Sequence, residues 1–189
     1  MHFDGYSSPG GRLAQDLVNT QDVVKGSDGI PDVPSLESFL RKRALSQDAP
    51  LTGADLALAI DLRTRLRRVF VGGERNSSLE ALNTMLRECG ATPQLITHDG
   101  SPLHLHVTTP DMPAVRRLGA DAAMGMLSVI RANGFERFRV CGGRRCQAVF
   151  LDVSKNGSRR FCSPSACGNR SRAATFRAKD RGARPPGDH

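Results

Sequence analysis

The chain has 189 residues, a length that fits one domain with a small appended module and excludes solenoids and large multidomain enzymes. Hydrophobic residues make up 39% and charged residues 24% of the sequence, so a packed core is expected and wholesale disorder is excluded. Aromatic residues make up only 5%, with no tryptophan, which disfavours a large cofactor pocket lined by aromatic rings.

The net charge of +8 is unevenly distributed along the chain. Residues 1–136 carry 14 basic and 16 acidic side chains, whereas residues 137–189 carry 13 basic and 3 acidic ones. A basic segment of this kind indicates contact with a polyanion. Nucleic acid is the first candidate, and an acidic membrane surface or an acidic protein is the alternative.

The sequence shows no membrane or secretory segment. Its longest apolar stretch, Leu118 to Ile130, contains Asp121 and falls short of the roughly 20 residues that cross a bilayer. Residues 1–16 lack the basic start and apolar run of a secretory signal. We therefore expect a cytoplasmic protein with no membrane partner.

Hydrophobic periodicity predicts a mostly helical region before the basic segment. Ser35 and Thr52 are expected to cap two of its helices, the second through a capping box with Asp55. Four arginines of that second helix are expected to form a solvated face: Arg63, Arg65, Arg67 and Arg68. The predicted helices cover residues 11–20, 35–46, 52–71, 78–88 and 110–133.

One β-hairpin interrupts these helices. Residues 94–98 and 103–108 are short β-leaning runs on either side of Asp99-Gly100, a dipeptide favoured in hairpin turns. The helical region contains no nucleophile–base pair, carboxylate pair or glycine-rich phosphate loop above background. An enzyme is therefore not expected.

Four cysteines form two pairs of equal spacing: Cys141 and Cys146, then Cys162 and Cys167, with fifteen residues between the pairs. Four thiolates satisfy tetrahedral Zn²⁺ and leave no position for water or substrate, so the expected ion is structural. Disulfides are the competing explanation. A cytoplasmic setting keeps thiols reduced and favours the metal.

The spacer between the cysteine pairs predicts a second hairpin. Its strands would be residues 147–153 and 158–161, joined by a turn at Lys155-Asn156-Gly157. Ser163 or Ser165 would then cap a helix that runs to about Lys179. The order of knuckle, hairpin and helix is that of a treble-clef-like finger. The expected fold class is α+β, mainly helical.

These residues resemble the CGNR zinc-finger family. The resemblance covers Cys141-x4-Cys146, Val149-Phe-Leu-Asp152, Ser154-Lys-Asn-Gly-Ser-Arg-Arg160 and Cys162-x4-Cys167-Gly-Asn-Arg170. Leu17-Val-Asn-Thr20 and the helices up to Asn133 resemble, more loosely, the ABATE domain that commonly precedes this finger. The resemblance implies one structural zinc ion on the four cysteines, DNA binding, and a stress-linked transcription regulator of bacteria.

The resemblance also makes Gly168, Asn169 and Arg170 candidates for a functional role. Each has a structural alternative: close packing for Gly168, hydrogen bonds to the backbone for Asn169, and an ion pair with Asp152 for Arg170. We divide the chain into a helical domain (1–136), a zinc finger (137–180) and a flexible tail (181–189). The expected nucleic-acid contacts are Arg159, Arg160, Arg170, Arg172, Arg177 and Lys179.

The leading hypothesis is a DNA-binding transcription regulator. Its helical domain would sense a small-molecule effector or form a homodimer. A homodimer would supply two fingers, which matters because a single small finger binds weakly. The alternative hypothesis is a zinc-stapled module that contacts RNA or protein without sequence-specific DNA binding.

Overall fold

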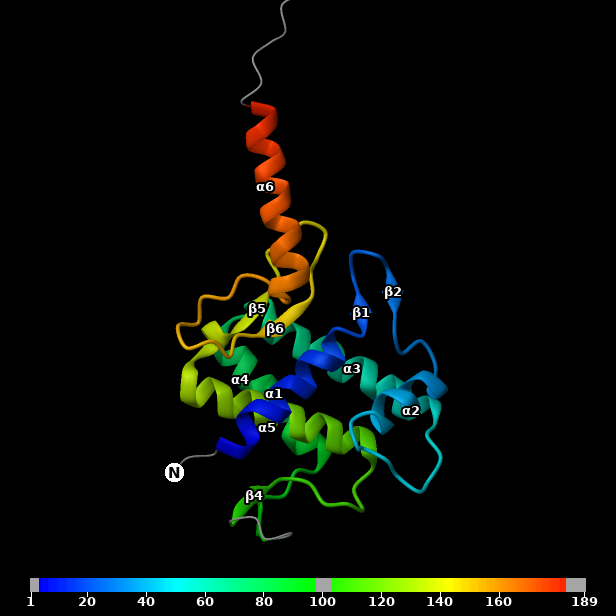
Figure 1. The fold of residues 1–189 in the computed structure, drawn as a ribbon. Helices are drawn as coiled ribbons and strands as arrows, with labels where there is room; N and C mark the ends of the chain where they lie inside the picture. Colours follow the sequence, from blue (N-terminus) through cyan, green and yellow to red (C-terminus); the bar gives the residue numbers. More distant parts are fainter. Residues whose placement is uncertain (1–3, 98–102, 183–189) are drawn as a thin grey trace, which may run out of the picture.

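The computed structural model describes residues 4–97 and 103–182. Figure 1 shows a helical body, a small ribbon of strands β5 (Phe138–Val140) and β6 (Val149–Leu151) with its loops, and a last helix, α6 (Asn169–Gly182), that projects away from both. The mainly helical fold with small hairpins and a C-terminal cysteine cluster confirms the expected fold class. Of the helices in the described residues, none has the length and apolarity needed to cross a membrane.

The centre of the body is the crossing of α1 (Asp4–Val18) and α5 (Ala114–Asn133). Glycines allow the two backbones to meet: a Cβ atom on Gly125 would lie 2.5 Å from the Cα atom of Gly10. Most of α5 is buried, which agrees with its apolar periodicity. The structure begins α1 earlier and α5 later than the sequence predicts.

Helices α2 (Val33–Arg41), α3 (Gly53–Phe70) and α4 (Arg75–Cys89) complete the body. The predicted capping box of Thr52 and Asp55 is confirmed. The predicted cap of α2 is wrong: the Asp32 carboxylate accepts a hydrogen bond of 2.9 Å from the Ser35 amide, because the helix starts two residues before Ser35. Helix α4 ends at Gly90, which adopts the left-handed conformation.

Two hairpins belong to the helical region. The predicted one is confirmed as β3 (Gln94–Ile96) paired with β4 (His104–His106), although its Asp99-Gly100 turn lies outside the described residues. The sequence did not predict the second, β1 (Gln21–Asp22) with β2 (Ser27–Asp28).

The first of the four arginines on α3 is not solvated. Arg63 is only 4% exposed, and its guanidinium donates to both carboxylate oxygens of Asp28 at 2.6 and 2.7 Å. The same group donates to the Thr20 hydroxyl at 3.0 Å. The expectation of a solvated face is therefore wrong for Arg63, which ties β2 and the end of α1 to α3.

The chain then passes through a short 3-10 turn, η1 (Phe135–Arg137), into β5 (Phe138–Val140). Strand β5 pairs antiparallel with β6 (Val149–Leu151), and a π-helical turn, η2 (Pro164–Gly168), leads into α6 (Asn169–Gly182). The predicted hairpin is therefore wrong in its second strand. The first cysteine pair lies in the connection between β5 and β6.

The two edges of β6 explain why residues 158–161 form no strand. One edge is paired with β5. Along the other, Gln15 of α1 and Asn19, the residue just after α1, form hydrogen bonds with the backbone of Leu151 and Val149. The predicted turn at 155–157 does form, with Gly157 at φ +58°, but no edge of β6 remains free for the chain that follows it.

Strand β6 separates two apolar clusters. Val149 and Leu151 belong to the main core of the helical body, whereas Phe150 between them packs with Cys141 and Cys167. This alternation is the normal period of a strand. The finger therefore shares one strand with the helical core.

Candidate metal centre and basic helix

The four predicted ligands come together in one cluster. Their Sγ atoms all lie within 4.8 Å of one another, with 3.8 Å between Cys146 and Cys162 and 3.6 Å between Cys162 and Cys167. A tetrahedral zinc ion with Zn–S bonds of about 2.3 Å places its sulfur atoms about 3.8 Å apart. The donor set and its spacing fit one structural zinc ion.

The first pair is held by a tight turn. The Cys146 amide donates to the Gly143 carbonyl at 3.1 Å, and Arg145 between them adopts φ +57°. A Cβ atom on Gly143 would lie 3.3 Å from the Cβ atom of Cys167, so this position favours a glycine. The Cys162 amide donates to the Cys141 sulfur at 3.3 Å and links the two pairs.

The second pair lies on either side of the start of η2, with Cys162 before it and Cys167 within it. The Ser163 hydroxyl accepts from the Ala166 amide at 3.1 Å, so Ser163 is the cap that the sequence offered as one of two choices. Cys141 and Cys167 are buried, while Cys146 and Cys162 are half-buried. Phe161 packs against the cluster formed by Cys141, Phe150 and Cys167 and so supports the site from one side.

Arg170 acts on the charge of the cluster. Burial raises the pKa of Cys167, but the guanidinium of Arg170, which donates to its sulfur at 3.1 Å, and the neighbouring thiols lower that pKa below its ordinary value. Burial raises the pKa of Cys146 and of Cys162. The expected alternative partner of Arg170, Asp152, is occupied elsewhere.

Asp152 closes the loop that precedes the second pair. Its carboxylate accepts from the Ser154 amide and hydroxyl at 2.9 and 2.6 Å, and from the Arg159 amide at 2.8 Å. The side chain is 1% exposed. Burial raises the pKa of Asp152, but these hydrogen bonds and the charge of Arg137 outweigh it and hold the pKa below its ordinary value.

Arg159 points into the finger. Its guanidinium donates to the Phe161 carbonyl at 2.8 Å and to the Cys162 carbonyl, and lies 5.0 Å from the centre of the Phe150 ring. The structure therefore gives this predicted DNA contact a different role, that of positioning the chain before Cys162.

Four of the other five predicted contacts lie on the surface. Arg160 is exposed beside the Phe161 ring, and Arg170, Arg172 and Arg177 are exposed on α6. The side chain of Lys179 lies outside the described residues, as does the predicted tail beyond Gly182, the end of α6.

The signature residues have clear structural roles. Gly168 is buried, and a Cβ atom there would lie 3.6 Å from the Phe161 ring. The Asn169 side-chain oxygen accepts from the Arg172 guanidinium within α6. Arg170, which donates to the Cys167 sulfur, links the start of α6 to the metal cluster.

Two family models match the chain. One, ABATE, is described as "Putative stress-induced transcription regulator" and matches residues 11–133. The other, described as CGNR zinc finger, matches residues 137–180, so both resemblances seen in the sequence are confirmed. A comparison with curated proteins gives no match.

Proposed function

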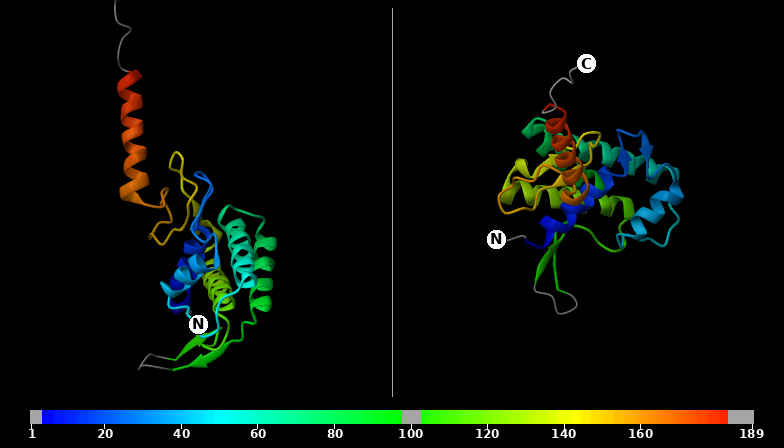
Figure 2. Two further views of the ribbon diagram at one scale, coloured as in Figure 1. Left: turned by 90° about the vertical axis from the view of Figure 1, so that its right-hand side faces the viewer. Right: turned by 45° about the horizontal axis from the view of Figure 1, so that its top comes forward.

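We propose that this chain, which belongs to the ABATE family and carries a CGNR zinc finger, is a bacterial transcription regulator. It would bind duplex DNA through α6. The observation that carries the proposal is the placement of this helix. Figures 1 and 2 show α6 extending away from the body. Its arginines Arg170, Arg172 and Arg177 are exposed.

The dimensions and charge of α6 support this function. Its 14 residues include five arginines or lysines and one aspartate. A helix of this length extends about 21 Å at 1.5 Å per residue. The major groove of DNA, about 12 Å wide, admits an α-helix, and a basic helix neutralises the phosphates along it.

The zinc ion would set the direction of this helix. Cys167 lies in the turn that leads into α6, so the metal fixes the helix at its first residues. Four thiolates complete the coordination and leave no position for a substrate. The proposal is therefore a structural centre in a regulator, with no enzymatic role, working in the cytoplasm where DNA is accessible.

The helical domain would regulate binding. A cavity of about 320 Å³ lies between α5 and the finger, lined by Val129 and Asn133 on one side and by Arg137, Asp152 and Lys155 among others on the second. The cavity is widely open to solvent, and we propose it as the place where an effector would bind. A homodimer would supply a second finger and raise affinity without new contacts.

The test of DNA binding is a salt titration with the full-length, zinc-loaded protein and a pool of random duplex DNA. We expect the logarithm of the binding constant to fall steeply with the logarithm of the salt concentration. The double variant Arg172→Ala/Arg177→Ala should reduce this slope by about two, because each substitution removes one cation that neutralises a phosphate.

The matched control removes two exposed cations from the helical body, Arg12 and Lys42, and should leave the slope unchanged. Failure to bind duplex DNA at low salt, with zinc confirmed in the protein, would contradict the proposal. Tighter binding to single-stranded RNA than to duplex DNA would favour the RNA-binding alternative instead.

A further inference from the structure

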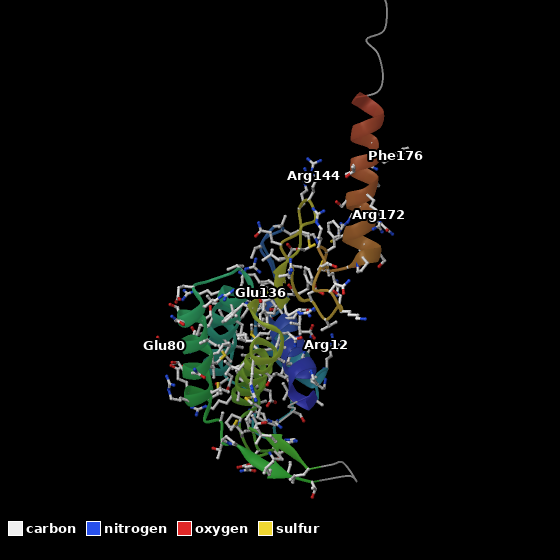
Figure 3. The ribbon with its side chains drawn as sticks, turned by 90° about the vertical axis from the view of Figure 1, so that its left-hand side faces the viewer. Arg12, Glu80, Glu136, Arg144, Arg172 and Phe176 are labelled. Carbon is white, nitrogen blue, oxygen red and sulfur yellow. The ribbon has the colours of Figure 1, made fainter. Side chains whose placement is uncertain are left out.

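The most exposed large apolar side chain of the described residues lies on the most basic helix. Phe176 is 72% exposed near the middle of α6. Figure 3 shows Phe176 and Arg172 on the side of α6 away from Arg144, which lies in the loop between Cys141 and Cys146. An aromatic ring in this position does not contribute to the packing of the finger.

The faces of α6 are distinct. Ser171 and Ala174 are half-buried and line a small cleft with Gly143 and Arg144, so this face turns toward the finger. At 3.6 residues per turn, the opposite face carries Asn169, Ala173, Phe176 and, one turn further on, Asp180. The first three are exposed.

Cations border this outward face on both sides. By helical spacing, Arg172 lies along one border and Arg177 along the other, with Arg170 beyond it. A second copy of α6 placed on this face would bring arginines against arginines, which is repulsive. A groove with phosphates on both walls engages both rows and covers the face between them.

We propose that the outward face of α6, formed by Asn169, Ala173 and Phe176, is the base-contacting face in the major groove, and that Phe176 contacts the 5-methyl group of thymine. This inference rests on the proposed DNA-binding function. Among the four bases, only thymine presents a methyl group in that groove, and apolar side chains recognise it. Arg172 and Arg177 hold the phosphates on the two walls.

The experiment uses the full-length, zinc-loaded protein and a duplex selected from a random pool by repeated binding. Each thymine of the selected duplex is replaced in turn by deoxyuridine, which removes only the methyl group. For the wild-type protein, we expect at least one replacement to weaken binding about fourfold, the value of one buried methyl group. For Phe176→Ala, the same replacement should have no effect.

Two further measurements separate this inference from its alternatives. Phe176→Ala should keep the zinc content, the melting temperature and the salt dependence of binding to random DNA, because the ring is exposed and uncharged. The control Val71→Ala removes an exposed apolar side chain of the helical body, 53% exposed, and should retain the full sensitivity to deoxyuridine.

The inference is overturned if wild type binds a selected duplex but no thymine methyl group matters, or if Phe176→Ala remains as sensitive as wild type. A lower molecular mass of Phe176→Ala in sedimentation would show that the ring joins two copies, and would also overturn it. Failure of wild type to bind any duplex at low salt contradicts the proposed function itself, so the two failures are distinguishable.

Discussion

Asn19 and Val149, which lie 130 residues apart, exchange two hydrogen bonds of 2.8 Å each. The side-chain amide of Asn19 donates to the Val149 carbonyl, and its oxygen accepts from the Val149 amide. Gln15, one helical turn earlier, accepts from the Leu151 amide at 2.9 Å. Helix α1 thus takes the place of a neighbouring strand along β6. The Leu17-Val-Asn-Thr20 segment is therefore the structural link between the helical body and the finger.

This link predicts a loss of stability in Asn19→Ala. Val149 is fully buried, so its amide and carbonyl would have no water to replace the lost side chain. We expect a loss of about 1–3 kcal/mol in the free energy of unfolding, measured by urea denaturation. The control Asn83→Ala, on the exposed side of α4, should change stability little. Equal stability of Asn19→Ala and wild type would contradict this role.

The α1–α5 crossing predicts that Gly125→Ala destabilises the body. The new methyl group would lie 2.5 Å from Gly10 backbone atoms, so the helices must separate. We expect a loss of about 1–3 kcal/mol, the usual effect of overpacking. The matched variant is Gly53→Ala, where no atom lies within 4 Å of the new methyl group. It should be neutral or stabilising by up to about 1 kcal/mol. Thermal melting of both variants checks the difference.

Removal of zinc should unfold the loops around the second cysteine pair but leave β6 folded. Chelation leaves the Cys162 and Gly168 amides without a fixed cluster, so their hydrogen exchange should approach that of an unfolded chain. The Val149 and Leu151 amides should remain protected, because their acceptors, Asn19 and Gln15, belong to the helical body and do not depend on zinc. Hydrogen exchange before and after chelation measures both sets. Loss of protection at all four amides would show that β6 depends on the metal as well.

The Asp28–Arg63 pair predicts a pH dependence of stability. The hydrogen bonds from Arg63 are the main reason that the pKa of Asp28 lies below its ordinary value of 3.8. The stabilisation is therefore complete above the unfolded pKa and disappears as the pH falls through the lower folded pKa. The free-energy difference between wild type and Asp28→Asn should shrink as the pH falls from about 6 through this region. A pH-independent difference would contradict it.

Local signals in the sequence were sufficient for some elements and not for others. The capping box at Thr52 and the four-cysteine cluster depend on residues near each other in the chain or on the chemistry of one ion, and both were predicted. The hydrogen bonds along the second edge of β6 were not, because they come from Gln15 on α1 and Asn19 just after it, about 130 residues away in the chain. Turn residues such as Asn156-Gly157 specify a turn but do not determine which strands pair.

Arg159 and Arg160 are neighbours in the sequence, but only Arg159 supports the metal-ligand loop, so the pair separates a structural role from DNA contact. Its guanidinium holds the carbonyls of Phe161 and Cys162, whereas that of the neighbouring Arg160 is exposed beside a ring. Arg159→Ala should lower zinc affinity about tenfold or more, as loss of a group supporting a metal ligand commonly does. Arg160→Ala should keep the zinc affinity, and both should be measured with a competing chelator. Equal zinc affinity in the two variants would show that the ligand loop is held by Asp152 alone.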